Sequence, residues 1–461
     1  MLILKNLLKV LVAIVVIYAV ARFVVVYQGS HLSGDRAPYI QMQTPNSVII
    51  RWMTKDERPG IVYFGENEKD LSKSEGESSP TKNHSVKLSN LKPATRYYYR
   101  TATLDGNDRP DAELQWFYTA PAEVVATRIW VMGDSGQAGD TLNQVRDSAL
   151  SWMQKNPLSL NRRAIPDTSY ENKPGIDVWL ALGDIAYSSG TNEQYQAALF
   201  DPFGELLANT ALWPVYGNHD DRRWAYFRIF DLPENAEAGG VASYTENYYS
   251  FDYSNIHFVM LDSQASDRSI NGDMVNWLKR DLAQNKKPWV IAAFHHPPYT
   301  KGSHDSDSVR DSRGRMQDMR ENILPVLEAG GVDLVFTGHS HMYERSYLLD
   351  CAYGYSESFT SANIVSSGIN NRHKHYLKPL KNKKNQGAVY MVTGSFSKVD
   401  QGPLNHPAHF VGLAQAGSVV IDVDNTVLTA RFVNNKGQVE DEFTISKQAG
   451  YVSDYPGCEE Q

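Results

Sequence analysis

The chain has 461 residues, of which 42% are hydrophobic and 21% are charged, so it can form a packed core in two or three domains. Its formal net charge is −8 at pH 7, which argues against nucleic acid as a partner. The only two cysteines, Cys351 and Cys458, are too few and too far apart for a thiolate metal site. In an exported chain they would either form one disulfide or remain two unpaired thiols.

The first 27 residues predict a targeting segment. Two lysines precede an unbroken apolar run over residues 10–21, and Ala19-Val20-Ala21 fits a small-x-small cleavage signal. The apolar stretch continues past Arg22 to Tyr27, which makes it 18 residues long, at the short end for a membrane span. Segment 1–27 is therefore either a signal peptide or an N-terminal membrane anchor. Both alternatives predict an exported protein, whether periplasmic, extracellular or anchored and facing outward.

Residues 36–121 predict a small all-β module. β-branched and aromatic runs recur at roughly ten-residue spacing without helical periodicity, which is the pattern of a β-sandwich. The runs cover residues 48–52, 61–64, 84–88, 96–100 and 114–118. The segment Leu91-Lys92-Pro93-Ala94-Thr95-Arg96-Tyr97 resembles the loop and tyrosine corner of fibronectin type III domains. We expect this module to serve packing or partner contact rather than chemistry.

Residues 126–447 predict an α/β body, because apolar runs of the parallel-strand type alternate with amphipathic helical patterns. The apolar runs cover residues 129–132, 178–182, 212–216, 256–261, 289–294 and 332–336. The helical patterns lie at residues 142–152, 275–282 and 323–327. Later strand patterns at residues 388–392, 418–423 and 427–432 are expected to complete a second sheet of the same body. Residues 371–385 read as a solvated basic loop, and 448–461 as a C-terminal tail.

Polar side chains of the metal-ligand type follow five of the six apolar runs. In chain order these blocks are Gly133-Asp134, Gly183-Asp184 with Tyr187, Gly217-Asn218-His219, His295-His296-Pro297 and Gly338-His339-Ser340-His341. A single Gly-Asp after a strand is an ordinary turn or helix cap. Open α/β sheets, however, place their ligand sites at the carboxyl ends of strands, and five such ends in one sheet are hard to explain structurally. The sixth run ends at Asp262, which could be a ligand, a supporting group or a turn residue.

These residue types favour a centre with two metal ions. They offer carboxylate, amide and phenol oxygens with imidazoles and no thiolate, which suits iron, zinc or manganese rather than a structural zinc. A carboxylate can bridge two cations about 3.5–4 Å apart. The glycines before Asp134, Asp184, Asn218 and His339 predict tight turns that hold these side chains over the sheet edge.

As a set, the five blocks resemble the metallophosphoesterase signature. The combination Asp134, Asp184-x-x-Tyr187, Asn218-His219, His295 and His339-x-His341 is similar to the purple acid phosphatase form of it. The resemblance covers roughly residues 36–447 and includes the fibronectin-like module that plant-type members carry. It implies a metallophosphoesterase-type β-sandwich of α/β (α+β) class, flanked by helices and preceded by the small all-β module.

The resemblance also implies roles for individual residues. One metal would be held by Asp134, Asp184, Tyr187 and His341. The other would be held by Asp184, Asn218, His295 and His339, with Asp184 as the bridge. The pair would be Fe(3+) with Fe(2+), Zn(2+) or Mn(2+). A metal-bound hydroxide would attack a small phosphate monoester, with His219 contacting the phosphate or orienting the hydroxide and His304 protonating the leaving alkoxide.

Several alternatives stay open on the residues alone. His296 is adjacent to the expected ligand of its block, although the His-x-Pro pattern favours the first histidine. His304 could be an exposed histidine, and Tyr187 could be a packing residue in a zinc or manganese site. The run Tyr343-Glu344-Arg345 fits an internal ion pair as well as substrate contact. Arg222-Arg223 fits a solvated surface better than a phosphate contact.

Three functions compete on this sequence. The leading hypothesis is an exported phosphomonoesterase of the acid phosphatase type with two metal ions. A phosphodiesterase or nucleotidase would use the same metals, and the outer loops would decide between the two. A cell-surface binding protein with an inactive hydrolase domain is disfavoured, because every expected metal ligand is present.

Overall fold

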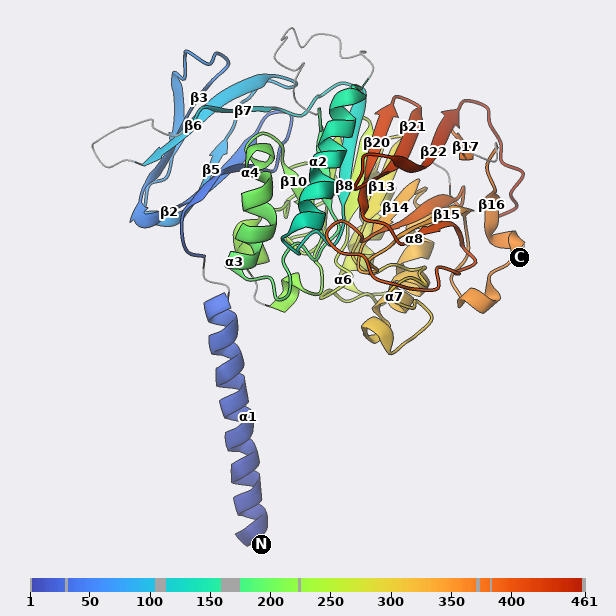
Figure 1. The fold of residues 1–461 in the computed structure, drawn as a ribbon, viewed down its shortest axis with the longest axis horizontal. Helices are drawn as coiled ribbons and strands as arrows, with labels where there is room; N and C mark the ends of the chain where they lie inside the picture. Colours follow the sequence, from blue (N-terminus) through green and yellow to red (C-terminus); the bar gives the residue numbers. More distant parts are fainter. Residues whose placement is uncertain are drawn as a thin grey trace.

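The structure is a computed structural model that describes residues 2–29, 32–103, 113–158, 175–222, 225–369, 374–381 and 384–457. The chain forms one long helix, a small β module and a larger α/β body (Figure 1). The module and the body lie side by side, and the helix projects away from both.

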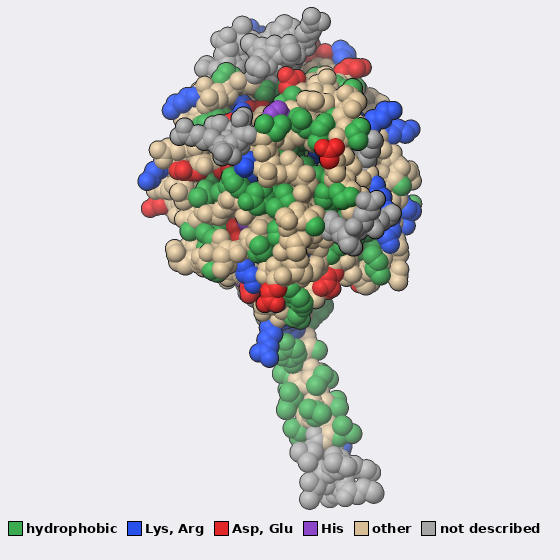
Figure 2. Space-filling view, turned by 90° about the vertical axis from the view of Figure 1, so that its right-hand side faces the viewer, with side chains coloured by type: hydrophobic (Ala, Val, Ile, Leu, Met, Phe, Trp, Pro, Cys, Tyr) green, Lys and Arg blue, Asp and Glu red, His purple; other side chains and the backbone are tan. Residues whose placement is uncertain are grey.

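Helix α1 (Leu2–Gly29) extends from the rest of the molecule as a single rod (Figure 1). Its described side chains are mostly hydrophobic and exposed, with Ile17 and Tyr18 each 67% accessible to solvent (Figure 2). Within the described part of the chain, no helix is long and apolar enough to cross a membrane. Whether segment 1–27 is a signal peptide or an anchor stays a prediction.

The small module is the β-sandwich that the sequence predicts. Its sheets have the strand orders β1-β2-β5 and β4-β3-β6-β7. The strands are β1 (Arg36–Gln41), β2 (Val48–Arg58), β3 (Gly60–Gly65), β4 (Lys73–Gly76), β5 (Thr81–Leu88), β6 (Arg96–Thr103) and β7 (Gln115–Tyr118). The hydroxyl of Tyr97 accepts a hydrogen bond from the backbone N–H of Lys92 at 3.0 Å, as in a tyrosine corner.

The body contains two mixed sheets. The seven-stranded sheet has the order β10-β9-β8-β20-β21-β22-β17, and the eight-stranded sheet has the order β11-β12-β13-β14-β18-β15-β16, with β19 paired to β15. The first consists of β8 (Thr127–Met132), β9 (Val178–Ala181), β10 (Leu212–Pro214), β17 (Lys374–Pro379), β20 (Gly417–Asp424), β21 (Val427–Asn434) and β22 (Val439–Gln448). The second consists of β11 (Tyr249–Tyr253), β12 (Ile256–Met260), β13 (Trp289–Ala293), β14 (Leu334–Thr337), β15 (Tyr343–Leu349), β16 (Ile364–Ser366), β18 (Ala388–Thr393) and β19 (His409–Leu413).

The division of strands between the sheets differs from the prediction. All six apolar runs are strands, but β8, β9 and β10 belong to one sheet and β12, β13 and β14 to the other. The late strands also separate, because β18 pairs with β14 whereas β20 and β21 continue from β8. An apolar run reports that a strand is buried and carries no information about which sheet it joins.

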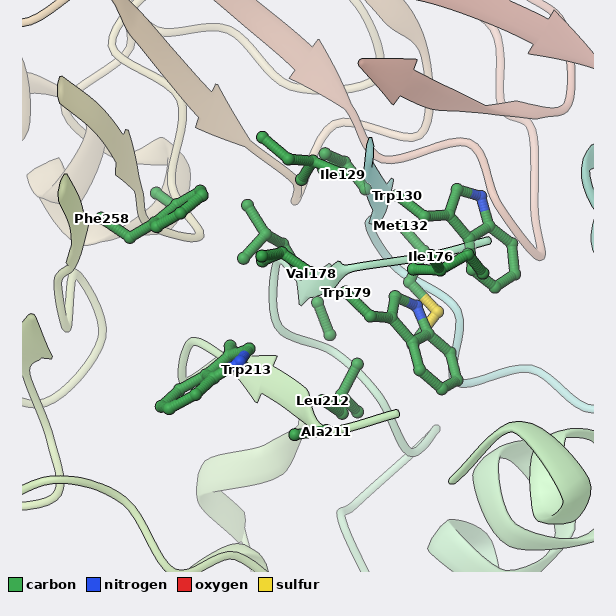
Figure 3. Close-up of a cluster of buried hydrophobic side chains, with 14 of the residues drawn as sticks. Ile129, Trp130, Met132, Ile176, Val178, Trp179, Ala211, Leu212, Trp213 and Phe258 are labelled. Carbon is green, nitrogen blue, oxygen red and sulfur yellow. The ribbon is translucent and has the colours of Figure 1, made fainter. Parts of the chain in front are cut away.

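The apolar runs are continuous because both faces of these strands are covered. Ile129 and Val178 project toward Phe258 of β12 in the other sheet, while Trp130 and Trp179 point the opposite way (Figure 3). The two tryptophan rings stack at 5.3 Å between centroids, and Phe203 lies 5.3 Å from Trp179. Burial on both faces holds the two sheets at a fixed distance and positions the strand ends that carry the polar blocks.

Helices other than α1 flank the sheets of the body (Figure 1). They and the short helical turns are α2 (Asp140–Lys155), α3 (Asn192–Tyr195), η2 (Gln196–Phe200), α4 (Asp201–Leu207), η3 (Asp220–Arg222), α5 (Tyr226–Ile229), α6 (Asp273–Gln284), η4 (Asp311–Gly314), α7 (Arg315–Asp318), η5 (Met319–Ile323), α8 (Leu324–Ala329), η6 (Ser356–Ser358) and η7 (Ser361–Asn363). The three predicted helical patterns are confirmed as α2, α6 and the α7-η5-α8 segment, which ends at Ala329 with Gly330 as its C-cap. Each turns its predicted apolar positions inward, for example Leu142 and Leu278.

Two expectations near the C-terminus fall partly outside the described residues. Cys351 is disulfide-bonded, and the other cysteine of the chain, Cys458, lies outside the described residues. The basic loop 371–385 includes residues 371–373 and 382–383, which also lie outside them.

Candidate metal centre

The candidate site forms where the carboxyl ends of strands from both sheets meet. Asp134 and Asp184 follow β8 and β9 of the seven-stranded sheet, whereas His295 and His339 follow β13 and β14 of the eight-stranded sheet. Hydrogen bonds link the two sheets at this edge, among them the following pair. The His339 N–H donates to Asp134 Oδ2 at 2.7 Å, and His295 Nδ1 lies 2.8 Å from the carbonyl oxygen of Leu182.

The turns that carry the ligands have an unusual backbone. Asp134, Asp184 and His339 have φ values of 55°, 52° and 66°, a left-handed conformation that costs a non-glycine residue about 1–3 kcal/mol. At two of the preceding glycines, a side chain would collide with a neighbouring aspartate. A Cβ on Gly217 would lie 2.2 Å from the Asp184 nitrogen, and one on Gly338 would lie 2.4 Å from Asp134 Oδ2.

Three side chains form a first group of potential ligands. The Tyr187 hydroxyl donates to Asp134 Oδ1 at 2.9 Å and lies 3.1 Å from His341 Nε2. The distance from His341 Nε2 to Asp134 Oδ1 is 3.5 Å. One phenol oxygen, one carboxylate and one imidazole therefore converge on a common point.

A second group adjoins the first at Asp184. His295 Nε2 lies 3.0 Å from Asn218 Oδ1 and 3.4 Å from Asp184 Oδ2. The ring of His339 lies 5.0 Å from that of His295. Asp134, Asp184 and His295 offer ligand atoms that all lie within 4.8 Å of one another, so the two groups share an edge.

The residues of both groups fit metal ions. Bonds of about 2.0–2.2 Å to nitrogen and oxygen place neighbouring ligand atoms of a tetrahedral or octahedral site roughly 2.8–3.6 Å apart. The ligand-atom distances given above run from 2.9 to 3.5 Å. The donors are hard oxygens and imidazole nitrogens without thiolate, which suits iron, zinc or manganese.

The local electrostatics also favour bound cations. Exclusion of water, together with the carboxylates of Asp134 and Asp184, raises the pKa of Tyr187 well above its usual value. Burial alone would raise the pKa of Asp184, but the charge and hydrogen bond of His295 lower it. Burial lowers the pKa of His339 well below its usual value, and the neighbouring histidines lower it further. A bound cation would oppose only the shift at Tyr187, because it favours the phenolate, whereas the lowered pKa values of Asp184 and His339 already favour the carboxylate and the neutral imidazole as ligands.

The two histidines expected to act on substrate lie beside this centre. His219 is half-buried, with Nδ1 2.8 Å from the Ser188 carbonyl and Nε2 3.9 Å from Asp184 Oδ2. His304 stacks on His339 at 3.9 Å between centroids, and its Nδ1 lies 2.8 Å from Asp311 Oδ1.

An open cavity of about 450 Å³ lies at this edge. Asn218, His304 and His339 line it, together with His296. His296 is buried with Nδ1 2.9 Å from the Ser263 hydroxyl, so it is His295 that contacts Asp184 and Asn218.

Three supporting residues carry no signal in the sequence. Asp400 Oδ2 lies 2.6 Å from His341 Nδ1, and the Ser312 hydroxyl lies 2.6 Å from His339 Nε2. Asp311 holds His304 as described above. All three lie in irregular or short helical segments without a motif, so only the folded chain brings them to the histidines.

The structure also decides two alternatives left open by the sequence. Asp262 is a turn residue, because its carboxylate accepts from the backbone N–H groups of residues 264, 265 and 266. The Tyr343-Glu344-Arg345 run is internal, since the Arg345 guanidinium lies 2.5 and 2.9 Å from the carboxylate oxygens of Asp441. The Arg222 side chain and Arg223 lie outside the described residues.

Comparisons with known proteins agree with this fold. The family model of the calcineurin-like phosphoesterases matches residues 127–343, and that of the purple acid phosphatase N-terminal domain matches residues 37–119. The body therefore has the calcineurin-like phosphoesterase fold. Because the chain joins both domain types, it is similar to the purple acid phosphatases.

Individual relatives support the same family. The chain is 29% identical to Purple acid phosphatase 18 of Arabidopsis thaliana over 67% of its own length and 65% of the relative. It is 32% identical to Purple acid phosphatase 15 of the same plant over 57% of its length, which spans 49% of that relative. Purple acid phosphatase PPD1 from yellow lupin seeds has the same fold, with a TM-score of 0.67 and 16% identity over 90% of this chain and 75% of that one.

Proposed function

We propose that this chain hydrolyses phosphate monoesters at a centre with two metal ions. One ion would be held by Asp134, Asp184, Tyr187 and His341. The other would be held by Asp184, Asn218, His295 and His339. The observation that carries the proposal is the junction of the two ligand groups at Asp184, beside a cavity that Asn218 and two further histidines line.

The chemistry divides between the ions and the side chains. When bound, two cations of this kind act as Lewis acids and lower the pKa of water. His219 donates Nδ1–H to the Ser188 carbonyl, which leaves Nε2 available for a substrate phosphate oxygen. His304 is oriented by Asp311 through Nδ1, so Nε2 can supply a proton to the leaving alkoxide. Asn218 and the two carboxylates fix the ligand geometry.

Tyr187 distinguishes iron from the other candidate metals. A phenol in this position becomes a ligand only as the phenolate, and a phenolate bound to Fe(3+) absorbs visible light. We therefore propose Fe(3+) beside Tyr187, His341 and Asp134, with Fe(2+), Zn(2+) or Mn(2+) as the second ion.

One set of variants tests the proposal on the purified full-length chain. We expect the wild type to carry two metal ions per chain, to absorb in the visible range and to hydrolyse p-nitrophenyl phosphate faster than its bis ester. Asp184→Asn should lower kcat by about 100-fold or more, because the bridging charge is lost. Tyr187→Phe should abolish the visible band, whereas Tyr244→Phe, a control at a tyrosine that is 79% exposed, should not.

Three results would contradict parts of this assignment. Full activity in Asp184→Asn would contradict the bridging role of Asp184. A colourless protein with full iron content would contradict the assignment of Tyr187 as a ligand. Faster hydrolysis of the bis ester would favour the phosphodiesterase alternative at the same centre.

A further inference from the structure

One wall of the cavity beside the metal centre is rich in arginine. The segment 310–315 contributes Arg310, Arg313 and Arg315, and all three line the cavity together with Asn218 and His339. Arg310 and Arg313 are exposed, and Arg315 is half-buried. The clustering is local, because the chain as a whole has a formal net charge of −8.

The positive charge of this wall is largely uncompensated. Within the described part of the chain, the side chains of Arg310 and Arg313 make no hydrogen bond or ion pair. Arg315 donates Nε–H to the Gln264 carbonyl at 3.0 Å and Nη1–H to the Ser312 carbonyl at 3.0 Å, so its partners are neutral. Burial lowers the pKa of Arg315, and repulsion by Arg268 and Arg313 lowers it further, while the more weakly acting charges of Asp221 and Asp262 raise it.

The carboxylates of the same cavity are already engaged. Asp311 accepts from His304 Nδ1 at 2.8 Å, from the Asp305 N–H at 2.9 Å and from the Ser312 hydroxyl at 2.9 Å. Asp221 accepts from the Tyr216 hydroxyl at 3.1 Å and from the Gln264 amide at 2.9 Å. These carboxylates are fixed to other groups and form no ion pair with the arginines. An anion entering the cavity would therefore find three guanidinium groups without a paired carboxylate.

The arginine segment lies next to the reaction site. Its own residues Asp311 and Ser312 contact His304 and His339, so the arginines flank the groups that face substrate. Ser312 and Arg313 have φ values of 51° and 55°, which are strained for residues other than glycine. The contacts of Asp311 with His304 and of Ser312 with His339 hold this strained turn beside the cavity that Arg310 and Arg313 line.

The size of the cavity leaves room for more than one phosphoryl group. Its volume of about 450 Å³ lies in the range of pockets for whole small molecules, roughly 300–1,000 Å³. Guanidinium groups bind phosphate oxygens through paired hydrogen bonds, and they do so better than ammonium groups. A second phosphate next to the one being hydrolysed would fit in this volume and could bind to the guanidinium groups.

We infer that the substrates carry a second phosphoryl group, as a diphosphate does, which Arg310, Arg313 and Arg315 bind beside the metal centre. This inference rests on the proposed phosphatase function and names its substrate class. In the reaction, the oxygen of water bonds to the reacting phosphorus and the bond from that phosphorus to the bridging oxygen breaks. The bridging oxygen leaves on the second phosphoryl group with a proton from His304.

The test compares two substrates in the metal-loaded full-length protein. Inorganic pyrophosphate carries the second phosphoryl group, and p-nitrophenyl phosphate carries an uncharged ring in its place. In the double variant Arg310→Ala/Arg313→Ala, kcat/KM for pyrophosphate should fall about tenfold or more relative to that for p-nitrophenyl phosphate. The lysine variant Arg310→Lys/Arg313→Lys, which keeps the charge, should recover part of that ratio. Arg280→Ala on α6, a control at an exposed arginine outside the cavity, should leave the ratio unchanged.

The outcomes separate this inference from the proposed function. An unchanged ratio in the double variant, or equal losses for both substrates, would overturn the inference and leave phosphatase activity intact. A wild type that hydrolyses p-nitrophenyl phosphate but not pyrophosphate would do the same. A metal-loaded wild type that hydrolyses neither substrate would overturn both.

Discussion

His341 is held from two sides. Its Nε2 faces Asp134 and Tyr187, and its Nδ1 lies 2.6 Å from Asp400 Oδ2, which also lies 3.0 Å from Lys398 Nζ. A carboxylate on the far nitrogen of a metal-binding imidazole fixes the tautomer and the ring orientation and raises the basicity of the ligating nitrogen. Asp400 is thus a positioning residue for the candidate metal site.

We predict that Asp400→Asn weakens metal binding by about 10- to 100-fold. The asparagine keeps the size of the side chain but loses the charge that favours the Nδ1–H tautomer of His341. The measurement is the metal content of the protein after dialysis against a graded series of chelator concentrations. Asp424→Asn, at an exposed aspartate on β20, is the matched control. Equal metal retention in both variants would contradict the role of Asp400.

The predictable residues of the site are those that follow strands directly. Asp134, Asp184 and His339 could be predicted because each lies just after an apolar run. In α/β folds the carboxyl ends of the strands lie at the same edge of the sheet, where ligands bind. Asp400 and Ser312 could not, because they reach the histidines through irregular segments whose path depends on the whole fold. The left-handed backbone of Asp134, Asp184 and His339 could not be predicted either. The sequence pattern placed the tight turns at the glycines that precede them.

At the scale of elements, one buried network joins the β11–β12 hairpin to helix α6. His257 on β12 lies 2.8 Å from Asp252 on β11 through Nδ1 and 2.8 Å from Asp281 on α6 through Nε2. Burial opposes the charged imidazole, but the two carboxylates outweigh it and raise the pKa of His257 to about 9. The protonated histidine is therefore the form that the folded state stabilises.

The pH dependence of this network follows from the raised pKa of His257. The folded pKa of about 9 exceeds the unfolded value of about 6.5, so the stabilisation is complete below pH 6.5 and is lost as the pH rises through 9. A shift of this size corresponds to roughly 3 kcal/mol. We predict that His257→Gln lowers the free energy of unfolding by about that amount at pH 6 and by much less at pH 10.

Denaturant unfolding of wild type and variant at the two pH values measures the difference. His375→Gln is the matched control, because His375 Nε2 bonds the Ser446 hydroxyl instead of carboxylates. A His257→Gln penalty that is the same at pH 6 and pH 10 would mean that the lost contribution is packing rather than charge.

Strand recognition from the sequence failed where charges are buried. β15 carries Glu344 and Arg345, both fully buried, which break the apolar pattern that marks the other strands of its sheet. Their partners lie far away in the sequence, as Thr300 donates to Glu344 and Asp441 pairs with Arg345. Such strands become recognisable only when the partner is known, whereas the apolar runs of β8 or β13 are recognisable locally.

At the scale of the whole molecule, the β module is fastened to the body by buried polar contacts. Arg51 of β2 donates to the carbonyls of Arg228 and Ile229 at 2.7 and 3.1 Å and lies 3.2 Å from Asp231 Oδ1. Arg36 of β1 donates to the Asn192 side chain at 2.8 Å. These guanidinium groups satisfy backbone and side-chain oxygens of the body, which ties the position of the module to the segment that follows the Asn218 turn.

We predict that Arg51→Ala weakens this attachment and lowers the stability of the whole chain by about 2–4 kcal/mol, since it leaves buried carbonyls and a carboxylate without their donor. For a body of this size that corresponds to a fall in Tm of roughly 3–6 °C by calorimetry. Lys55→Ala on the same strand is the control, because its ion pair with Asp35 is exposed and contributes little. If the β module and the α/β body unfolded independently, Arg51→Ala would leave the thermal unfolding midpoints of both parts unchanged. A coupled molecule instead loses stability in the α/β body when a residue of the β module is changed.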